Sequence, residues 1–76
     1  MRKFTKVSNV LRRLRKEKGI TQKTLSEETG LPLGTIKQYE SGTRQPNFIN
    51  ALKLVHYYNI DFSCLPFEAD YRHKVK

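Results

Sequence analysis

The chain has 76 residues, a formal net charge of +8 and 37% hydrophobic residues. A chain of this length forms one small domain, which buries only about 60% of the surface of its unfolded state and has no room for a large catalytic cleft. Its single cysteine, Cys64, excludes a disulfide framework and a cysteine-based metal site, and no apolar run approaches the ~20 residues of a membrane span.

The positive charge is concentrated at the N-terminal end. The first eighteen residues carry eight of the fifteen basic residues and one of the seven acidic ones, whereas residues 19–65 carry four of each. This excess indicates attraction to a polyanion, with an ordinary solvated basic surface as the alternative. The N-terminal sequence lacks the apolar core of a secretory signal, so a reducing cytoplasm is the expected location.

The first predicted helix begins near Thr5 or Ser8 and ends before Gly19. Its apolar residues recur at positions i, i+3, i+4 and i+7, which is the spacing of one buried helix face. These residues are Val7, Val10, Leu11 and Leu14.

Two short helical patterns follow, separated by a tight turn at Gly30. Thr21 is expected to cap the first, because its hydroxyl can accept a hydrogen bond from a free backbone N–H of the opening turn. The second covers residues 33–41 and stops at Gly42, a residue suited to the left-handed position after a helix. Two short helices joined by a glycine-containing turn are typical of the helix-turn-helix that reads DNA.

Two more helices are predicted before the end of the chain. Asn47 caps a fourth helix, and Asp61 caps a short fifth helix that ends before Pro66. The expected apolar stripe of the fourth helix is Phe48, Ala51, Leu52 and Val55.

This ordered pattern resembles the lambda-repressor/Cro-like helix-turn-helix family, also called the xenobiotic-response-element type, over roughly residues 10–65. The matching positions are Leu11, Leu14, Arg15, Gly19, Ile20, Thr21, Gln22, Leu25, Gly30, Ile36, Glu40, Ser41, Gly42 and Pro46. The resemblance implies an all-α, compact five-helix DNA-binding domain in which the second and third helices form the helix-turn-helix. We therefore expect a basic N-terminal arm over residues 1–7, the domain over residues 8–65 and a C-terminal tail over residues 66–76.

One face of the third predicted helix is expected to meet DNA. Ile36 and Tyr39 fall on its apolar side, so that the opposite side is free to enter the major groove. The expected base readers on that side are Leu33, Gly34, Lys37 and Gln38. Family members usually have polar residues where Pro32, Leu33, Gly34 and Thr35 stand here.

Each base reader has its own chemistry. Gln38 can pair bidentately with adenine, and Lys37 can reach a guanine or a phosphate; an ordinary solvated helix face is the alternative for both. Leu33 offers apolar contact, most naturally with a thymine methyl, unless it packs into the core. Gly34 has no side chain and could let the backbone approach the bases closely.

Phosphate contacts are expected at the start of the second helix and around the third. Gln22 begins the second helix, where free N–H groups and the helix dipole favour an anion, and the family uses a glutamine at the matching place for DNA contact. The expected phosphate-binding residues are Gln22, Lys23, Thr35, Thr43 and Arg44. For Arg44 the alternative is a solvent-exposed loop cation.

A structural ion pair is implied between Arg15 and Glu40, because the family typically links its first and third helices by a salt bridge at these positions. A guanidinium suits a carboxylate geometrically. Phosphate contact by Arg15 could add to this role.

A homodimer is expected because one recognition helix reads only a few base pairs. Family members often dimerise through the fifth helix and its flanks. The corresponding residues here are Ile60, Phe62, Cys64, Leu65 and Phe67. His56 and His73 lie too far from other ligand types to suggest a metal, and no catalytic arrangement or cofactor site is indicated.

The sequence therefore predicts a sequence-specific double-stranded DNA-binding transcriptional regulator rather than an enzyme. The favoured form is a small phage- or mobile-element-type repressor that acts by occupying an operator. One alternative is the antitoxin of a toxin–antitoxin pair, which would hold a protein partner through the C-terminal tail. Another is a protein-interaction module that no longer reads DNA.

Overall fold

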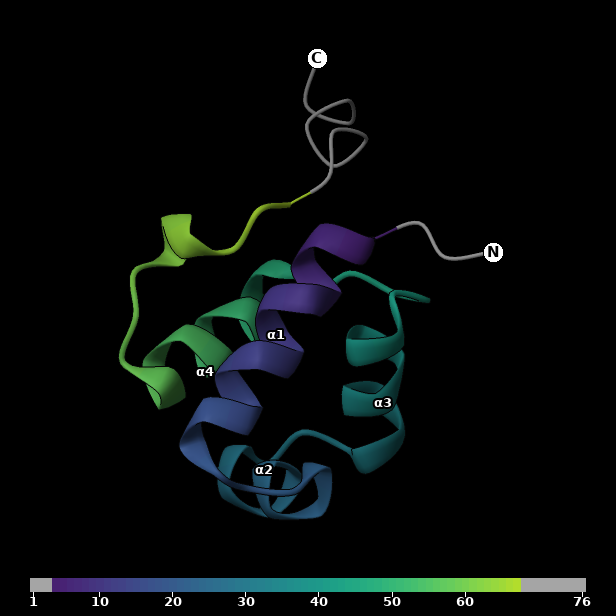
Figure 1. The fold of residues 1–76 in the computed structure, drawn as a ribbon, viewed down its shortest axis with the longest axis vertical. Coiled ribbons are helices and arrows are strands. Elements are labelled where there is room, and N and C mark those ends of the chain that lie inside the picture. Colours follow the sequence, from purple (N-terminus) through teal and green to yellow (C-terminus); the bar gives the residue numbers. More distant parts are fainter. Residues whose placement is uncertain (1–3, 68–76) are drawn as a thin grey trace.

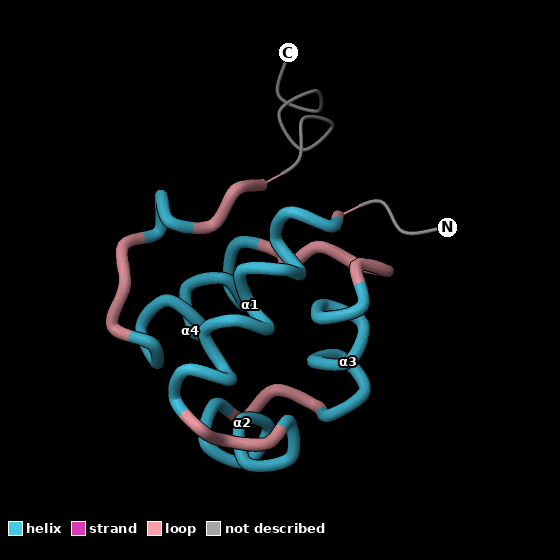
Figure 2. Tube along the Cα trace, in the orientation of Figure 1, coloured by secondary structure: helices cyan, strands magenta, loops and turns pink. Residues whose placement is uncertain are grey.

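The structure, a computed structural model, describes residues 4–67, which form four α-helices and one 3-10 turn and include no strand (Figures 1 and 2). The elements are α1 (Thr5–Lys18), α2 (Gln22–Thr29), α3 (Leu33–Ser41), α4 (Phe48–Tyr58) and η1 (Phe62–Cys64). In Figure 1, α1 runs across the middle of the view with α3 on one side and α4 on the other, and α2 closes the lower end. The all-α fold is as predicted. None of the helices in residues 4–67 is long and apolar enough to cross a membrane.

Two of the four helices, α2 and α4, begin at residues whose side chains cap them. The hydroxyl of Thr21 accepts a hydrogen bond of 3.1 Å from the backbone N–H of Thr24, and the side-chain oxygen of Asn47 accepts one of 2.8 Å from the N–H of Asn50. Each bond satisfies one N–H that the first turn of a helix leaves without an intrahelical partner.

Each of the two helices of the helix-turn-helix, α2 and α3, ends at a glycine with left-handed backbone. Gly30 after α2 has a φ of 80° and Gly42 after α3 has a φ of 85°. A side chain is strained in this conformation, so glycine lets the chain turn sharply and start the next segment. The turn from α2 into α3 is further tied by the hydroxyl of Ser26, which donates to the carbonyl of Leu31 at 2.6 Å.

The core lies where the four helices meet. Its buried apolar residues are Val7, Leu11, Leu25, Leu31, Ile36, Tyr39, Ala51, Leu54, Val55 and Leu65. Removing one leucine or isoleucine side chain of this kind from water contributes about 1.5–3 kcal/mol, so packing rather than helix propensity holds these short helices.

The predicted apolar stripe of the fourth helix is half right, because Ala51 and Val55 are buried but Phe48 and Leu52 are not. Leu54 is 2% exposed and replaces Leu52 in the core, whereas Phe48, Ile49 and Leu52 are 54%, 60% and 39% exposed. The buried positions Ala51, Leu54 and Val55 follow helical spacing, but so does the exposed apolar set. With apolar residues on two faces of one helix, spacing alone did not identify the face that packs.

The predicted boundary between arm and domain is also corrected. α1 begins at Thr5, and Val7 is 1% exposed, so residues 5–7 belong to the domain rather than to a basic arm. The backbone N–H of Phe4 also donates to the carbonyl of Gly42 at 3.3 Å, which ties the start of α1 to the end of α3. Residues 1–3 of the expected arm lie outside the described residues.

The fifth helix is shorter than expected. It is the single 3-10 turn η1, and Asp61 makes no capping bond to it; its carboxylate instead accepts from the hydroxyl of Ser63 at 2.7 Å. Cys64 is exposed, while Leu65 turns back into the core. Residues 68–76 of the predicted tail lie outside the described residues.

Candidate nucleic-acid interface

α3 has two sharply different faces. Ile36 and Tyr39 are 1% and 3% exposed, so they face inward, as the sequence predicted. Gly34, Lys37 and Gln38 are exposed on the other side, which we call the recognition face. Leu33, at the start of the helix, is half-buried and lies between the two faces. The helix itself lies at the edge of the molecule (Figure 1).

The inner face of α3 is fixed by a buried carboxylate. Glu40 is 3% exposed, and the expected ion pair is present: Arg15 Nε lies 2.8 Å from one Glu40 oxygen and 3.1 Å from the other. Arg15 Nη1 donates to the carbonyl of Ile20 at 2.9 Å, so the same guanidinium also holds the loop between α1 and α2. The carboxylate thus joins α1 to α3, and Arg15 carries that link to the start of the helix-turn-helix.

Gln22 takes part in this network. Its side-chain nitrogen donates to Glu40 Oε1 at 3.0 Å, which links the first residue of α2 to the last turn of α3. Gln22 therefore positions the two helices of the helix-turn-helix against each other, a role the sequence did not suggest.

Arg12 is a second residue whose role the sequence missed. Its Nη1 donates to the backbone carbonyl of Glu40, and its Nη2 donates to Asn9 Oδ1. A cation at the C-terminal end of a helix is favourable because the free carbonyls there carry partial negative charge. The available signal was spacing, because Arg12 stands three residues before Arg15 and so shares its face of α1.

The other residues expected to bind phosphate are all accessible to solvent. Lys23, Thr43 and Arg44 are exposed and Thr35 is half-buried. The loop that carries Thr43 and Arg44 is anchored to α3, because both backbone N–H groups donate to the carbonyl of Gln38, at 3.0 and 3.3 Å. The backbone of Thr43 and Arg44 is thus fixed relative to the end of α3.

Gly34 is unusual within this interface. A glycine inside a helix costs about 0.5–1 kcal/mol relative to alanine. Unlike Gly30 and Gly42, Gly34 does not have a positive φ, so its backbone conformation does not require glycine. A Cβ added to Gly34 would have no atom within 4 Å outside its own stretch of helix, so there is also room for a side chain.

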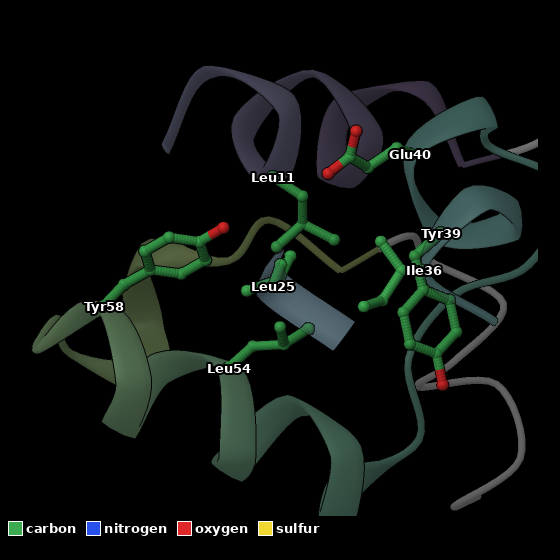
Figure 3. Close-up of a pocket in the computed structure, with 7 residues that line it drawn as sticks. All are labelled: Leu11, Leu25, Ile36, Tyr39, Glu40, Leu54 and Tyr58. Carbon is green, nitrogen blue, oxygen red and sulfur yellow. The ribbon is translucent and has the colours of Figure 1, made fainter. Parts of the chain in front are cut away.

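The core contains a small cavity, of about 10 Å³, roughly the space of one water molecule. Figure 3 shows the residues that line it, which are Leu11, Leu25, Ile36, Tyr39, Glu40, Leu54 and Tyr58. Among the described residues, the hydroxyl of Tyr58 is a buried polar group with no hydrogen-bond partner. Burial raises the pKa of Tyr58, and the negative charge of Glu40 raises it further. A space of this size and lining belongs to the core rather than to a ligand site.

The expected dimer residues divide into two groups. Leu65 is 3% exposed and packs in the core, so its inclusion in the dimer surface was wrong. Ile60, Phe62 and Phe67 are half-buried and Cys64 is exposed.

The apolar surface around η1 continues onto α4 through Phe48, which is exposed. The ring of Phe62 packs edge-on against Phe48 at 5.6 Å between centroids and stacks on Phe67 at 5.3 Å. Together with Ile49 and Leu52 they form what we call the apolar face, which the sequence had placed on η1 and its flanks alone. Within residues 4–67 no cluster of histidine, cysteine or carboxylate side chains could hold a metal ion.

Comparisons with known proteins agree with this geometry. A profile of the helix-turn-helix family matches residues 11–63. The structure is similar to the crystal structure of the restriction-modification controller protein C.AhdI from Aeromonas hydrophila, with a TM-score of 0.76 and 33% sequence identity over 83% of this chain and 96% of that chain. A search of curated protein sequences gives no match.

Proposed function

The chain belongs to the lambda-repressor/Cro-like helix-turn-helix family, and from that premise we propose that it regulates transcription by binding a specific double-stranded DNA operator. The observation that carries the proposal is the pair of faces on α3. On one face Ile36, Tyr39 and Glu40 are buried against the rest of the protein, while on the other face Lys37 and Gln38 are exposed. A helix held this way can enter the major groove without rearranging.

Within this proposal, Gln38 is the principal base reader. Its amide has a donor and an acceptor that match the N7 and N6 positions of adenine. Lys37, its neighbour, is a flexible point charge better suited to guanine or to a phosphate.

Phosphate contacts position the domain without specifying sequence. We assign this role to the exposed residues Lys23, Thr43 and Arg44 and to the half-buried Thr35. Gln22 could add a contact only with the part of its amide that does not bind Glu40.

We place the dimer contact on the apolar face, with Ile60 and Cys64 at its border. Scattered apolar residues are normal on a surface, but this set is contiguous through its ring contacts and lies on adjoining elements. Two copies would present two recognition helices about 34–36 Å apart on a symmetric operator.

The regulator would act as a repressor, by occupying the operator and blocking polymerase. The likeness to C.AhdI favours a second candidate, a controller of a restriction-modification gene pair. The two candidates differ in the genes next to the operator, not in the mode of DNA binding.

Selection of bound duplexes from random DNA tests the proposal. We expect a palindromic consensus with an adenine in each half-site, and an affinity that falls steeply with salt because each phosphate contact releases counterions. Failure to enrich any sequence, together with a DNA affinity that does not change with salt concentration, would contradict the proposal and favour a protein-interaction module. Co-purification of a second protein that competes with DNA would favour the antitoxin.

Sedimentation analysis tests the dimer. Phe48→Ser should convert a dimer to a monomer without loss of helix content, whereas the control Glu17→Ser, at an exposed position on α1, should leave the dimer intact. A wild-type protein that is monomeric both free and on DNA would overturn this part of the proposal.

A further inference from the structure

Gly34 is a glycine that the folded chain does not require. Its backbone is ordinary helix, and a Cβ there would have no neighbouring atom within 4 Å outside its own stretch of helix. Alanine would therefore fit and would favour the helix, because glycine has the greater conformational freedom to lose. The folded chain itself therefore gives no reason for the missing side chain.

The place of Gly34 indicates what that reason is. It is exposed on the recognition face, next to Leu33 and one turn before Gln38. A glycine in such a position lets another molecule approach the helix backbone closely. Because DNA is the partner proposed for this face, the close approach is to a base edge in the major groove.

The chemistry at this end of α3 selects among the bases. Neither Gly34 nor Leu33 has a side-chain donor or acceptor, so neither can pair with the hydrogen-bonding edge of a base. The 5-methyl group of thymine is the apolar feature of the major groove. A methyl group is also the size of the Cβ that glycine lacks.

We propose that α3 reads a thymine through Gly34, with the thymine methyl filling the space that a Cβ would occupy and resting against Leu33. The inference depends on the proposed function and adds to it the identity of one base. It assigns the start of α3 to thymine and the middle of α3, through Gln38, to adenine.

Replacement of thymine by deoxyuridine, which removes only the 5-methyl group, tests the proposal. The probe is the duplex selected from random DNA by the wild-type protein, with each thymine replaced in turn. One position in each half-site should weaken wild-type binding by about fourfold, the worth of one buried methyl group. Gly34→Ala should weaken binding to the thymine duplex by about tenfold, the scale of one mismatched base pair, and by clearly less on the deoxyuridine duplex.

Two controls separate lost contact from lost folding. Gly34→Ala should raise the Tm by about 2–8 °C, so weaker binding cannot come from unfolding. Glu17→Ala, at an exposed position on α1, should bind both duplexes as the wild type does.

The contrary results are distinct. Equal binding of the thymine duplex by Gly34→Ala and wild type, or the absence of any deoxyuridine-sensitive position, would overturn the inference while leaving the proposed function intact. An equal loss on both duplexes would overturn the thymine assignment. A wild-type protein that selects no sequence would refute the proposed function itself.

Discussion

The inner and outer faces of α3 differ in what holds their side chains. On the inner face, Ile36 and Tyr39 are enclosed by the core, and Glu40 accepts hydrogen bonds from Arg15 and Gln22. On the outer face, Gly34, Lys37 and Gln38 are exposed. One short helix thus carries a rigid side that fixes its position and a side available to another molecule.

In this small domain, stability and recognition are therefore assigned to opposite faces of one helix. Residues one position apart, such as Ile36 and Lys37, should have unrelated functions because they point in different directions. Substitutions on the inner face should change the free energy of unfolding. Substitutions on the outer face should change DNA affinity without destabilising the fold.

The largest effect is expected for Ile36→Ala. Loss of this buried side chain should lower the free energy of unfolding by about 2–5 kcal/mol, since the core cannot fully close around the space left. Lys37→Ala is the matched control, and urea unfolding should show a change within about 0.5 kcal/mol. Equal destabilisation by the two substitutions would mean that the faces are not separated.

Glu40→Ala should have the next largest effect, a loss of about 1–3 kcal/mol. It removes the acceptor of Arg15 and Gln22 and leaves the partly buried guanidinium without its carboxylate. Glu40→Gln should cost less, because the amide oxygen can still accept. A thermal melt in which Glu40→Ala matches the wild type would show that the ion pair contributes nothing to the position of α3.

A smaller effect on stability is expected for Tyr58, a residue of α4 that lines the core cavity together with the inner face of α3. Burial raises the pKa of its hydroxyl above the ordinary value of about 10. Above pH 10 the unfolded chain therefore releases a proton that the folded protein retains, so stability is unaffected below pH 10 and falls as the pH rises further.

Tyr58→Phe isolates this effect. The substitution should cost little at pH 7, because the hydroxyl has no hydrogen-bond partner, and the variant should lose less stability than the wild type between pH 9 and 11. Urea unfolding over that range checks it, and identical pH profiles for the two proteins would show that the hydroxyl reaches water.

The elements of the helix-turn-helix could be predicted from the sequence, because each depends on local chemistry. The cap at Thr21 and the left-handed Gly30 and Gly42 follow from neighbouring residues, and the structure confirms all three. The inward side of α3 was predictable because its apolar residues lie on one face only.

Features that depend on tertiary packing could not be predicted in the same way. α4 has apolar residues on two faces, and only its neighbours decide that Leu54 is buried and Leu52 exposed. Leu65 enters the core because the chain turns back after η1. Gln22 and Arg12 bind Glu40, which is distant in the sequence; spacing put Arg12 on the same face as Arg15, but it did not identify the group that either residue would bind.

Binding of the selected operator by Gln38→Ala is the most direct test of the separation of the two faces. The substitution should weaken binding by about 1–3 kcal/mol, relax the preference at one base pair in each half-site, and leave the unfolding curve and the salt dependence of binding unchanged. If Gln38→Ala instead binds the operator as tightly and as selectively as the wild type, Gln38 does not read DNA, which contradicts the role proposed for the exposed face of α3.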